Sequence, residues 1–254
     1  MTRKISAEIV SQERIASDVC SMWLQTGDMA REAKAGQFIN IFSADRSRLL
    51  PRPISICRID PEKGLLRVVY RIVGAGTEEF SRLQAGDSIQ VMGPLGNGYP
   101  IEEGRALLIA GGIGIPPMLQ LAHSLPGPVT AVLGYRSERF LEEEFAPLGD
   151  VLIAAEDGSC GTKGTVMDAL QEHPVQADVI YSCGPAPMLR AVKDYARDKG
   201  IKAWLSLEER MACGVGACLG CVCKSTAVDD HTRVHNKRVC KDGPVFEAGE
   251  VDLS

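Results

Sequence analysis

Residues 106–119 read ALLIAGGIGIPPML and decide how the middle of the chain folds. An apolar run of strand type passes through three glycines, and two prolines follow where a helix would begin. Glycine lets the backbone turn sharply, and proline is favoured in the first turn of a helix. The stretch therefore predicts a buried strand, a tight loop and a helix that ends near Ser124.

This alternation of strand and helix continues toward the C-terminus. Apolar runs follow at 129–134, 151–155 and 179–182, and helical patterns at 165–171 and 187–199. One face of the last helix carries Met188, Leu189, Val192 and Tyr195. Gly200 is placed to end that helix. Alternating strands and helices predict an α/β domain with a doubly wound parallel sheet over residues 102–207.

Residues 1–101 have a different pattern, with short strand-like runs separated by glycine and proline. The runs lie at 5–10, 22–26, 37–42, 53–59, 65–73 and 88–92. Short strands at regular spacing without helical periodicity predict a small antiparallel β barrel, which has no exposed sheet edges.

The composition limits the class of protein. The 254 residues are 45% hydrophobic and 24% charged, which is typical of a globular protein. The formal net charge of −5 offers no field that attracts a nucleic acid. The N-terminal residues lack the apolar core of a signal peptide, and the apolar stretch 106–121 is too interrupted to cross a membrane. We therefore expect a cytoplasmic protein with no nucleic-acid or membrane partner.

Residues 208–254 are rich in glycine and cysteine and too short for a core of their own. Cys213-x4-Cys218-x2-Cys221 is followed after 18 residues by Cys240. This is the plant-type ferredoxin spacing for a [2Fe-2S] cluster. The glycines between these cysteines leave room for backbone N–H groups to approach sulfur. The spacing predicts that the segment folds around this cluster.

A zinc site is the main alternative for the same region. Cys218, Cys221, His231 and His235 approximate a zinc-finger pattern. That interpretation leaves Cys213 and Cys240 without a role, and it would make the chain a zinc-binding interaction module.

Cys223 lies two residues beyond Cys221 and could replace a ligand if the stretch is extended. We favour a buried thiol, because the set of four is complete without it.

The barrel sequence contains candidate flavin-binding residues. Arg52, Pro53, Ile54 and Ser55 open one strand, where a guanidinium suits a pyrophosphate and the serine a flavin edge. The next strand carries Val69, Tyr70 and Arg71, in which the tyrosine is a candidate ring-stacking aromatic. Gly76 and Thr77 follow at the start of a helix, where anions bind. Each feature also has a structural interpretation, as a surface arginine or a turn glycine.

The α/β sequence contains candidate nicotinamide-binding residues at strand ends, where open sheets bind ligands. They are Gly111, Gly112, Gly114 and Pro117 in the first loop, Glu156 and Asp157 after a later strand, and Gly184 and Pro185 after Cys183. Cys183 is the candidate catalytic residue, with a buried thiol as the alternative. Arg136 and Arg139 could favour a 2′-phosphate, so NAD against NADP stays open.

The order of these motifs resembles the ferredoxin reductase-like electron transfer subunits of class 1B dihydroorotate dehydrogenase. The resemblance covers nearly the whole chain. It is carried by RPIS at 52–55, 69–77, GPLGNG at 93–98, 111–117, SCGP at 182–185, EERMACGVGAC at 208–218 and VCKDGPVF at 239–246. The last two stretches are the most discriminating. The gap between Cys221 and Cys240 looks long for the family, and charged residues fill it.

The resemblance implies three cofactors. FAD would lie on the barrel against residues 52–55, 69–71 and 76–77, NAD on the second domain, and the [2Fe-2S] cluster on Cys213, Cys218, Cys221 and Cys240. It also implies a partner, an FMN-containing catalytic subunit that oxidises dihydroorotate, in a heterotetramer with two copies of each chain.

The expected function is therefore electron transfer from that FMN through [2Fe-2S] and FAD to NAD+, in pyrimidine (UMP) biosynthesis. A flavin is needed between the other two groups because it exchanges electrons singly or in pairs. The alternative is the flavin and iron-sulfur subunit of a related NAD(P)H-dependent ferredoxin or sulfide oxidoreductase.

Overall fold

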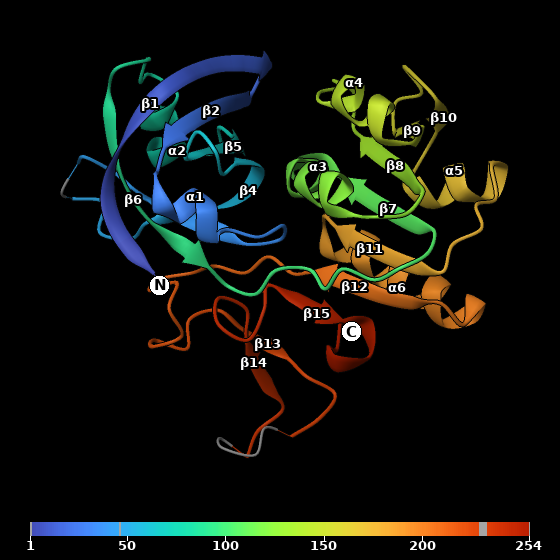
Figure 1. Cartoon of the computed structure of the whole chain (residues 1–254). Coiled ribbons are helices and arrows are strands. Elements are labelled where there is room, and N and C mark those ends of the chain that lie inside the picture. Colours follow the sequence, from blue (N-terminus) through green and yellow to red (C-terminus); the bar gives the residue numbers. More distant parts are fainter. Residues whose placement is uncertain (1, 46, 229–232, 254) are drawn as a thin grey trace.

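The computed structural model describes residues 2–45, 47–228 and 233–253 (Figure 1). Its N-terminal part is a closed barrel with the strand order β1-β2-β5-β4-β3-β6, in which all neighbours are antiparallel. The strands are β1 (Arg3–Ala16), β2 (Val19–Gln25), β3 (Phe38–Phe42), β4 (Arg52–Asp60), β5 (Leu65–Arg71) and β6 (Ser88–Leu95). The predicted barrel is confirmed, and β1 and β2 are longer than expected.

The side chains that alternate toward the inside of the barrel form its core. Ile39 and Ile41 on β3 and Leu66, Val68 and Tyr70 on β5 point inward and are at most 1% exposed. Two short helices, α1 (Asp28–Glu32) and α2 (Ala75–Phe80), lie in the connections and contribute buried side chains to this core.

The second part is a sheet with the order β10-β9-β8-β7-β11-β12-β15. Its parallel strands are β7 (Ala106–Gly111), β8 (Val129–Tyr135), β9 (Asp150–Ala155), β10 (Thr162–Lys163), β11 (Val179–Cys183) and β12 (Lys202–Ser206). Helices α3 (Ile115–Ser124) and α4 (Glu142–Phe145) cover one face, and α5 (Val166–Glu172) and α6 (Ala186–Lys199) cover the other. Short 3-10 turns span Gly112–Gly114, Ala146–Leu148 and Ala248–Glu250. The doubly wound arrangement is confirmed.

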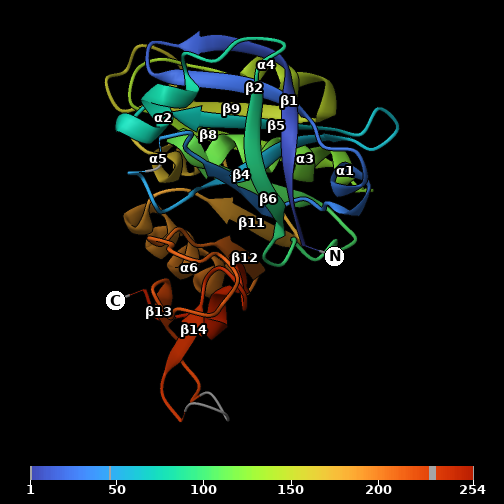
Figure 2. The ribbon, with the colours of Figure 1, turned by 90° about the vertical axis from the view of Figure 1, so that its left-hand side faces the viewer.

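The cysteine-rich segment is joined to this sheet. Strand β15 (Val245–Glu247) pairs antiparallel with β12, and its Phe246 is 1% exposed in the core beneath α6. Strands β13 (Val222–Lys224) and β14 (Asn236–Arg238) form a separate hairpin. Figure 2 shows this hairpin below α6, away from the barrel. The short strands β10, β12, β13, β14 and β15 were not predicted.

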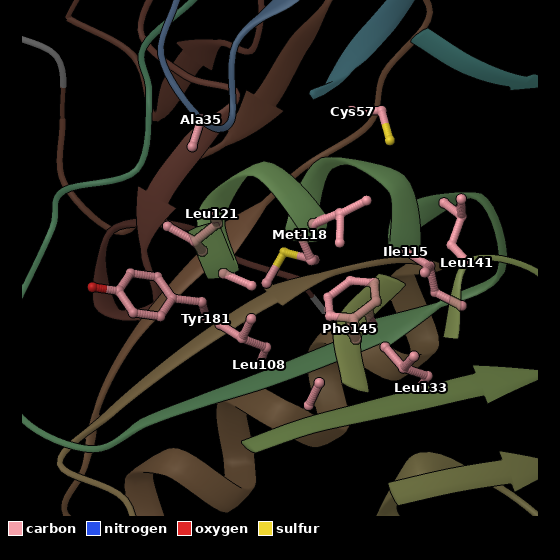
Figure 3. Close-up of a cluster of buried hydrophobic side chains, with 14 of the residues drawn as sticks. Ala35, Cys57, Leu108, Ile115, Met118, Leu121, Leu133, Leu141, Phe145 and Tyr181 are labelled. Carbon is pink, nitrogen blue, oxygen red and sulfur yellow. The ribbon is translucent and has the colours of Figure 1, made fainter. Parts of the chain in front are cut away.

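One hydrophobic core connects the barrel with the sheet. Ile115, Met118 and Leu121 of α3 lie between Cys57 of the barrel and Leu108 of β7 (Figure 3). Polar contacts border this core. The guanidinium of Arg67 on β5 donates to both carboxylate oxygens of Glu144 on α4, at 2.7 and 2.8 Å. These contacts fix the barrel against the α/β part, which sets the geometry between their two candidate sites.

Among the described helices, none combines the length and the apolar character needed to span a bilayer.

Candidate cofactor sites

The four cysteines with ferredoxin spacing are brought together as two pairs. The side chains of Cys213 and Cys218 are direct neighbours, and so are those of Cys240 and Cys221. In a [2Fe-2S] cluster each iron takes two protein ligands, so two adjacent pairs match the chemistry of the donors. Cys221 and Cys240 are 2% exposed, whereas Cys218 is exposed. The cluster would thus have a buried side and a solvent-facing side.

Backbone N–H groups surround these sulfurs. The N–H groups of Val215 and Ala217 donate to Sγ of Cys213 at 3.4 and 3.3 Å, and that of Gly216 donates to Sγ of Cys240 at 3.1 Å. Those of Gly220 and Cys240 donate to Cys218 and Cys221, each at 3.4 Å. Such donors stabilise negative charge on sulfur and tune the reduction potential of a cluster.

The surroundings of Cys213 favour a thiolate. Burial raises the pKa of this thiol, but hydrogen bonds from the N–H of Val215, from Cys218 and from the N–H of Ala217 outweigh that effect and lower the pKa to about 6. Because the thiolate is the form that binds metal, Cys213 is suited to bind a cation.

An ion pair that sequence reasoning missed closes the cysteine loop. The guanidinium of Arg238 contacts both carboxylate oxygens of Asp242 at 3.0 Å and also donates to the carbonyl of Gly216 at 3.2 Å. It therefore ties the glycine loop to the backbone on either side of Cys240. The sequence signal for this ion pair was the spacing of Arg238 and Asp242, two opposite charges four residues apart on either side of Cys240.

The zinc interpretation fits this arrangement poorly. Cys221 and Cys240 lie at one end of the β13–β14 hairpin, whereas His235 is exposed at the other end. The remaining histidine of that pattern, His231, lies outside the described residues. Within the described ranges, no three candidate ligands converge on a single point, as one zinc ion would require. A two-iron cluster needs only two protein ligands at each iron.

Cys223 lies on β13 opposite Lys237 and is partly buried. Burial, followed by the nearby carboxylate of Glu209, raises the pKa of its thiol to about 11. A neutral thiol in this position supports the interpretation of Cys223 as a packing residue.

The candidate flavin site on the barrel contains a close contact between Arg52 and Gly76. A Cβ on Gly76 would lie 2.8 Å from Nε of Arg52, so the guanidinium lies directly across the start of α2. Pro53, Ile54 and Ser55 follow on β4 and are half-buried. Thr77 caps the same turn, since its hydroxyl accepts from the N–H of Val73 at 3.0 Å. Arg52, Gly76 and Thr77 thus meet as one positively charged cradle, which fits a pyrophosphate.

The position of Tyr70 on the neighbouring strand β5 differs from the prediction. Tyr70 is 1% exposed, packs edge-on against Phe80 inside the barrel and donates its hydroxyl to Gln12. The interpretation of Tyr70 as a ring-stacking aromatic is therefore wrong, because strand alternation turns its ring inward with Val68. Val69 instead packs in the core shared with the sheet, and Arg71 pairs with Asp18 at 3.0 Å.

The glycines after β7 have two different roles. A Cβ on Gly114 would lie 2.3 Å from the carbonyl oxygen of Cys183, and one on Gly111 would lie 2.8 Å from Sδ of Met188. These two glycines let neighbouring loops pack closely. Gly112 has a φ of +54° and open space where a Cβ would be. Pro117 is buried in the first turn of α3. Gly112 is therefore the residue of this loop whose backbone faces free space.

The end of β11 meets that loop. Burial raises the pKa of the Cys183 thiol to about 12, so this candidate catalytic residue is a neutral thiol near pH 7. A Cβ on Gly184 would lie 2.5 Å from Cε of Met188, and Pro185 begins α6 as its exposed N-cap residue. Strands β7 and β11 are neighbours, which places these residues at the same carboxyl edge.

The acidic candidates lie further along this edge. Glu156 and Asp157 follow β9 and are exposed. Asp157 accepts a hydrogen bond from the N–H of Ser159 at 2.9 Å, which supports the turn. Arg136 and Arg139 are also exposed, and Arg139 pairs with Glu142 at 3.4 Å.

Comparison with known proteins adds two family profiles and close relatives. Residues 6–99 match the oxidoreductase FAD-binding domain, and residues 208–252 match the iron-sulfur cluster binding domain of dihydroorotate dehydrogenase B. The chain is 43% identical to the dihydroorotate dehydrogenase B (NAD(+)) electron transfer subunit of Bacillus mycoides (strain KBAB4) and 42% identical to that of Bacillus cereus (strain G9842). Each alignment covers 100% of both proteins.

Solved structures show the same architecture. A chain of the NADH-dependent reduced ferredoxin-NADP oxidoreductase, studied for flavin-based electron bifurcation, is 33% identical with a TM-score of 0.87, covering 97% of this chain and 90% of that one. The FAD/NAD-binding domain of a nitric oxide dioxygenase from Vibrio cholerae, 20% identical with a TM-score of 0.67, shares the fold over 77% of this chain and 93% of its own. The full-length relatives, together with the barrel and the paired cysteines, show that this chain belongs to the family of dihydroorotate dehydrogenase B (NAD(+)) electron transfer subunits.

Proposed function

We propose that this chain relays electrons from a dihydroorotate-oxidising partner to NAD+ through a [2Fe-2S] cluster and FAD, as part of pyrimidine (UMP) biosynthesis. The observation that carries the proposal is the position of the four paired cysteines. Their loop packs against β3 of the barrel, next to the strand that begins with Arg52. A site for single electrons therefore adjoins a site for a flavin.

When bound, a flavin exchanges electrons singly with an iron-sulfur cluster and as a hydride with nicotinamide. The residues of this chain bind and orient these groups. Arg52 supplies positive charge at the start of α2, and Cys213, Cys218, Cys221 and Cys240 would hold the irons. Gly112 leaves backbone accessible for a dinucleotide, and the neutral thiol of Cys183 contributes no charge at the same edge.

The partner subunit would approach the exposed side of the cysteine loop. Cys218 is exposed, and beside it Leu219 is 58% and Val215 44% exposed. Apolar side chains around an exposed ligand suit a protein interface. We assign this surface to contact with an FMN-containing catalytic subunit in a heterotetramer with two copies of each chain. A cytoplasmic location is supported by the nine cysteines, all of which are free.

The test is the Cys218→Ser variant in the complex with its catalytic subunit. We expect loss of NAD+ reduction by dihydroorotate, while NADH oxidation by an artificial flavin acceptor is kept. Cys223→Ser is the matched control and should retain both reactions. Full dihydroorotate-dependent NAD+ reduction in the Cys218 variant would contradict the proposed path.

A second candidate function is that of a subunit in a ferredoxin-linked NAD(P)H oxidoreductase. The similarity at a TM-score of 0.87 and 33% identity favours it, although the 43% identity to the Bacillus subunit favours the first. The complex isolated from its native cells separates the two, because only the first contains a chain that oxidises dihydroorotate. Steady-state rates with NADH and NADPH would decide the nucleotide, for which we propose NAD.

A further inference from the structure

Asn40 is a buried polar residue at the boundary between the barrel and the cysteine loop. It is 0% exposed in the otherwise apolar strand β3. Its strand neighbours are Pro53 on β4, directly after Arg52, and Met92 on β6. Since Ile39 and Ile41 point into the barrel, alternation directs Asn40 outward. It thus lies between the candidate flavin strand and the candidate cluster.

The side chain of Asn40 contacts the backbone at the first cysteine of the loop. Its Nδ2 donates to the carbonyl of Cys213 at 3.4 Å, a long hydrogen bond. A Cβ on Gly214 would lie 2.3 Å from the same nitrogen, so the loop is in direct contact with the amide. Gly214 also has a φ of +69°, which favours glycine. Any residue with a Cβ at position 214 would displace the Asn40 amide, so this contact requires glycine.

The other end of the Asn40 amide lacks a partner. Its Oδ1 is one of two buried side-chain polar atoms without a hydrogen bond among the described residues. The second, Nε of Arg71, lies 3.0 Å from Asp18. An unpartnered buried acceptor destabilises the folded state and therefore calls for a reason other than stability.

We propose that Asn40 is a positioning residue that fixes the Cys213 loop to the flavin-binding side of the barrel. By holding the Cys213 carbonyl toward the barrel, it leaves the N–H groups of Val215 and Ala217 directed at the Cys213 sulfur. It therefore sets the hydrogen bonds around one cluster ligand and the position of that ligand relative to β4. This inference rests on the ligand assignment made above.

The test uses the full-length holoprotein with Asn40→Leu, which keeps the volume but removes both polar atoms. Iron release to a ferrous chelator should be about tenfold faster, as expected for loss of a residue that supports a metal ligand. The EPR g-values of the reduced cluster should change. FAD content should be unchanged and the thermal midpoint unchanged or higher, because an unpartnered acceptor is removed. Asn40→Asp, which lacks the donor, should also release iron faster.

Asn236→Leu is the matched control. Asn236 is exposed on β14, at the end of the hairpin away from Cys221 and Cys240, so the same substitution there leaves the surroundings of the cysteine sulfurs unchanged. It should keep the wild-type EPR spectrum and rate of iron release. If the wild-type protein contains the cluster and the Asn40→Leu variant has the same EPR spectrum and the same rate of iron release, this inference is overturned but the proposed function is not. A lower thermal midpoint with an unchanged spectrum would reduce Asn40 to a structural residue. Wild-type protein without iron and sulfide would overturn the proposed function as well.

Discussion

The barrel and sheet differ from the cysteine segment in what holds them together. The barrel and sheet are built around aliphatic and aromatic side chains that water does not reach, and α3 links the two parts through one core. Residues 208–254 place Phe246 and the buried cysteines against that body. Their loop is otherwise organised by N–H···S bonds and the Arg238–Asp242 ion pair. A packed core stabilises the barrel and the sheet, whereas bound iron would stabilise the fold of the cysteine segment.

The largest expected effect comes from exchanging one cysteine of the segment. Cys221→Ser should abolish the cluster, because it removes a ligand from the buried pair, whereas Cys223→Ser should retain it. Iron and acid-labile sulfide per chain measure both variants. Cluster loss in the Cys223 variant with retention in the Cys221 variant would show that the ligand set is misassigned.

Iron removal should affect the two regions unequally. A chelator under reducing conditions should expose residues 208–228 and 233–244 to protease, because their fold depends on the metal. The barrel should keep its FAD, and β15 should slow cleavage beyond 244. Limited proteolysis with mass spectrometry reads out the sites. Uniform cleavage throughout the chain would mean that the regions are not separately stabilised.

Within the packed body, a substitution at Gly76 should weaken flavin binding. Gly76→Ala places a Cβ 2.8 Å from the Arg52 guanidinium and displaces it, which should lower FAD affinity about 10- to 100-fold for the loss of a charged hydrogen bond. Gly74→Ala is the control, because its Cβ would meet open space. Fluorescence titration of the apoprotein with FAD compares them. Equal FAD affinities of the Gly76→Ala and Gly74→Ala variants would exclude Arg52 at the start of α2 as part of the FAD site.

Substitutions at the two glycines after β7, Gly112 and Gly114, should have the smallest effects on the cofactor sites. Gly114→Ala should destabilise the fold by about 1–3 kcal/mol, because its Cβ would overlap the Cys183 carbonyl. Gly112→Ala should cost about 1–2 kcal/mol for its positive φ but should raise the KM for NADH, since its Cβ projects into free space at the strand ends. Denaturant unfolding measures the free energy of unfolding of both variants, and steady-state kinetics measures their KM for NADH. An unchanged KM in the Gly112 variant would separate that loop from the dinucleotide.

Features with a local cause could be predicted from the sequence. The barrel strands and the strand–helix repeats follow from periodicity, and the spacing of the four cysteines identified side chains that the structure brings together as two pairs. The burial of Tyr70 was also predictable, because it is in phase with Leu66 and Val68 on β5. Asn40, Arg238 and the pairing of β15 with β12 depend on contacts between residues far apart in sequence. A single polar residue in the apolar run FINIF was the only signal for Asn40.

The most direct test of the central claim is low-temperature EPR of the anaerobically purified protein, reduced by NADH alone. Electrons from NADH can reach the cysteine loop only through a bound flavin next to a cluster. The account predicts the spectrum of a reduced [2Fe-2S] cluster in wild type and its absence in Cys221→Ser. A protein that binds FAD and oxidises NADH but gives no iron-sulfur signal, even with a stronger reductant, would contradict it.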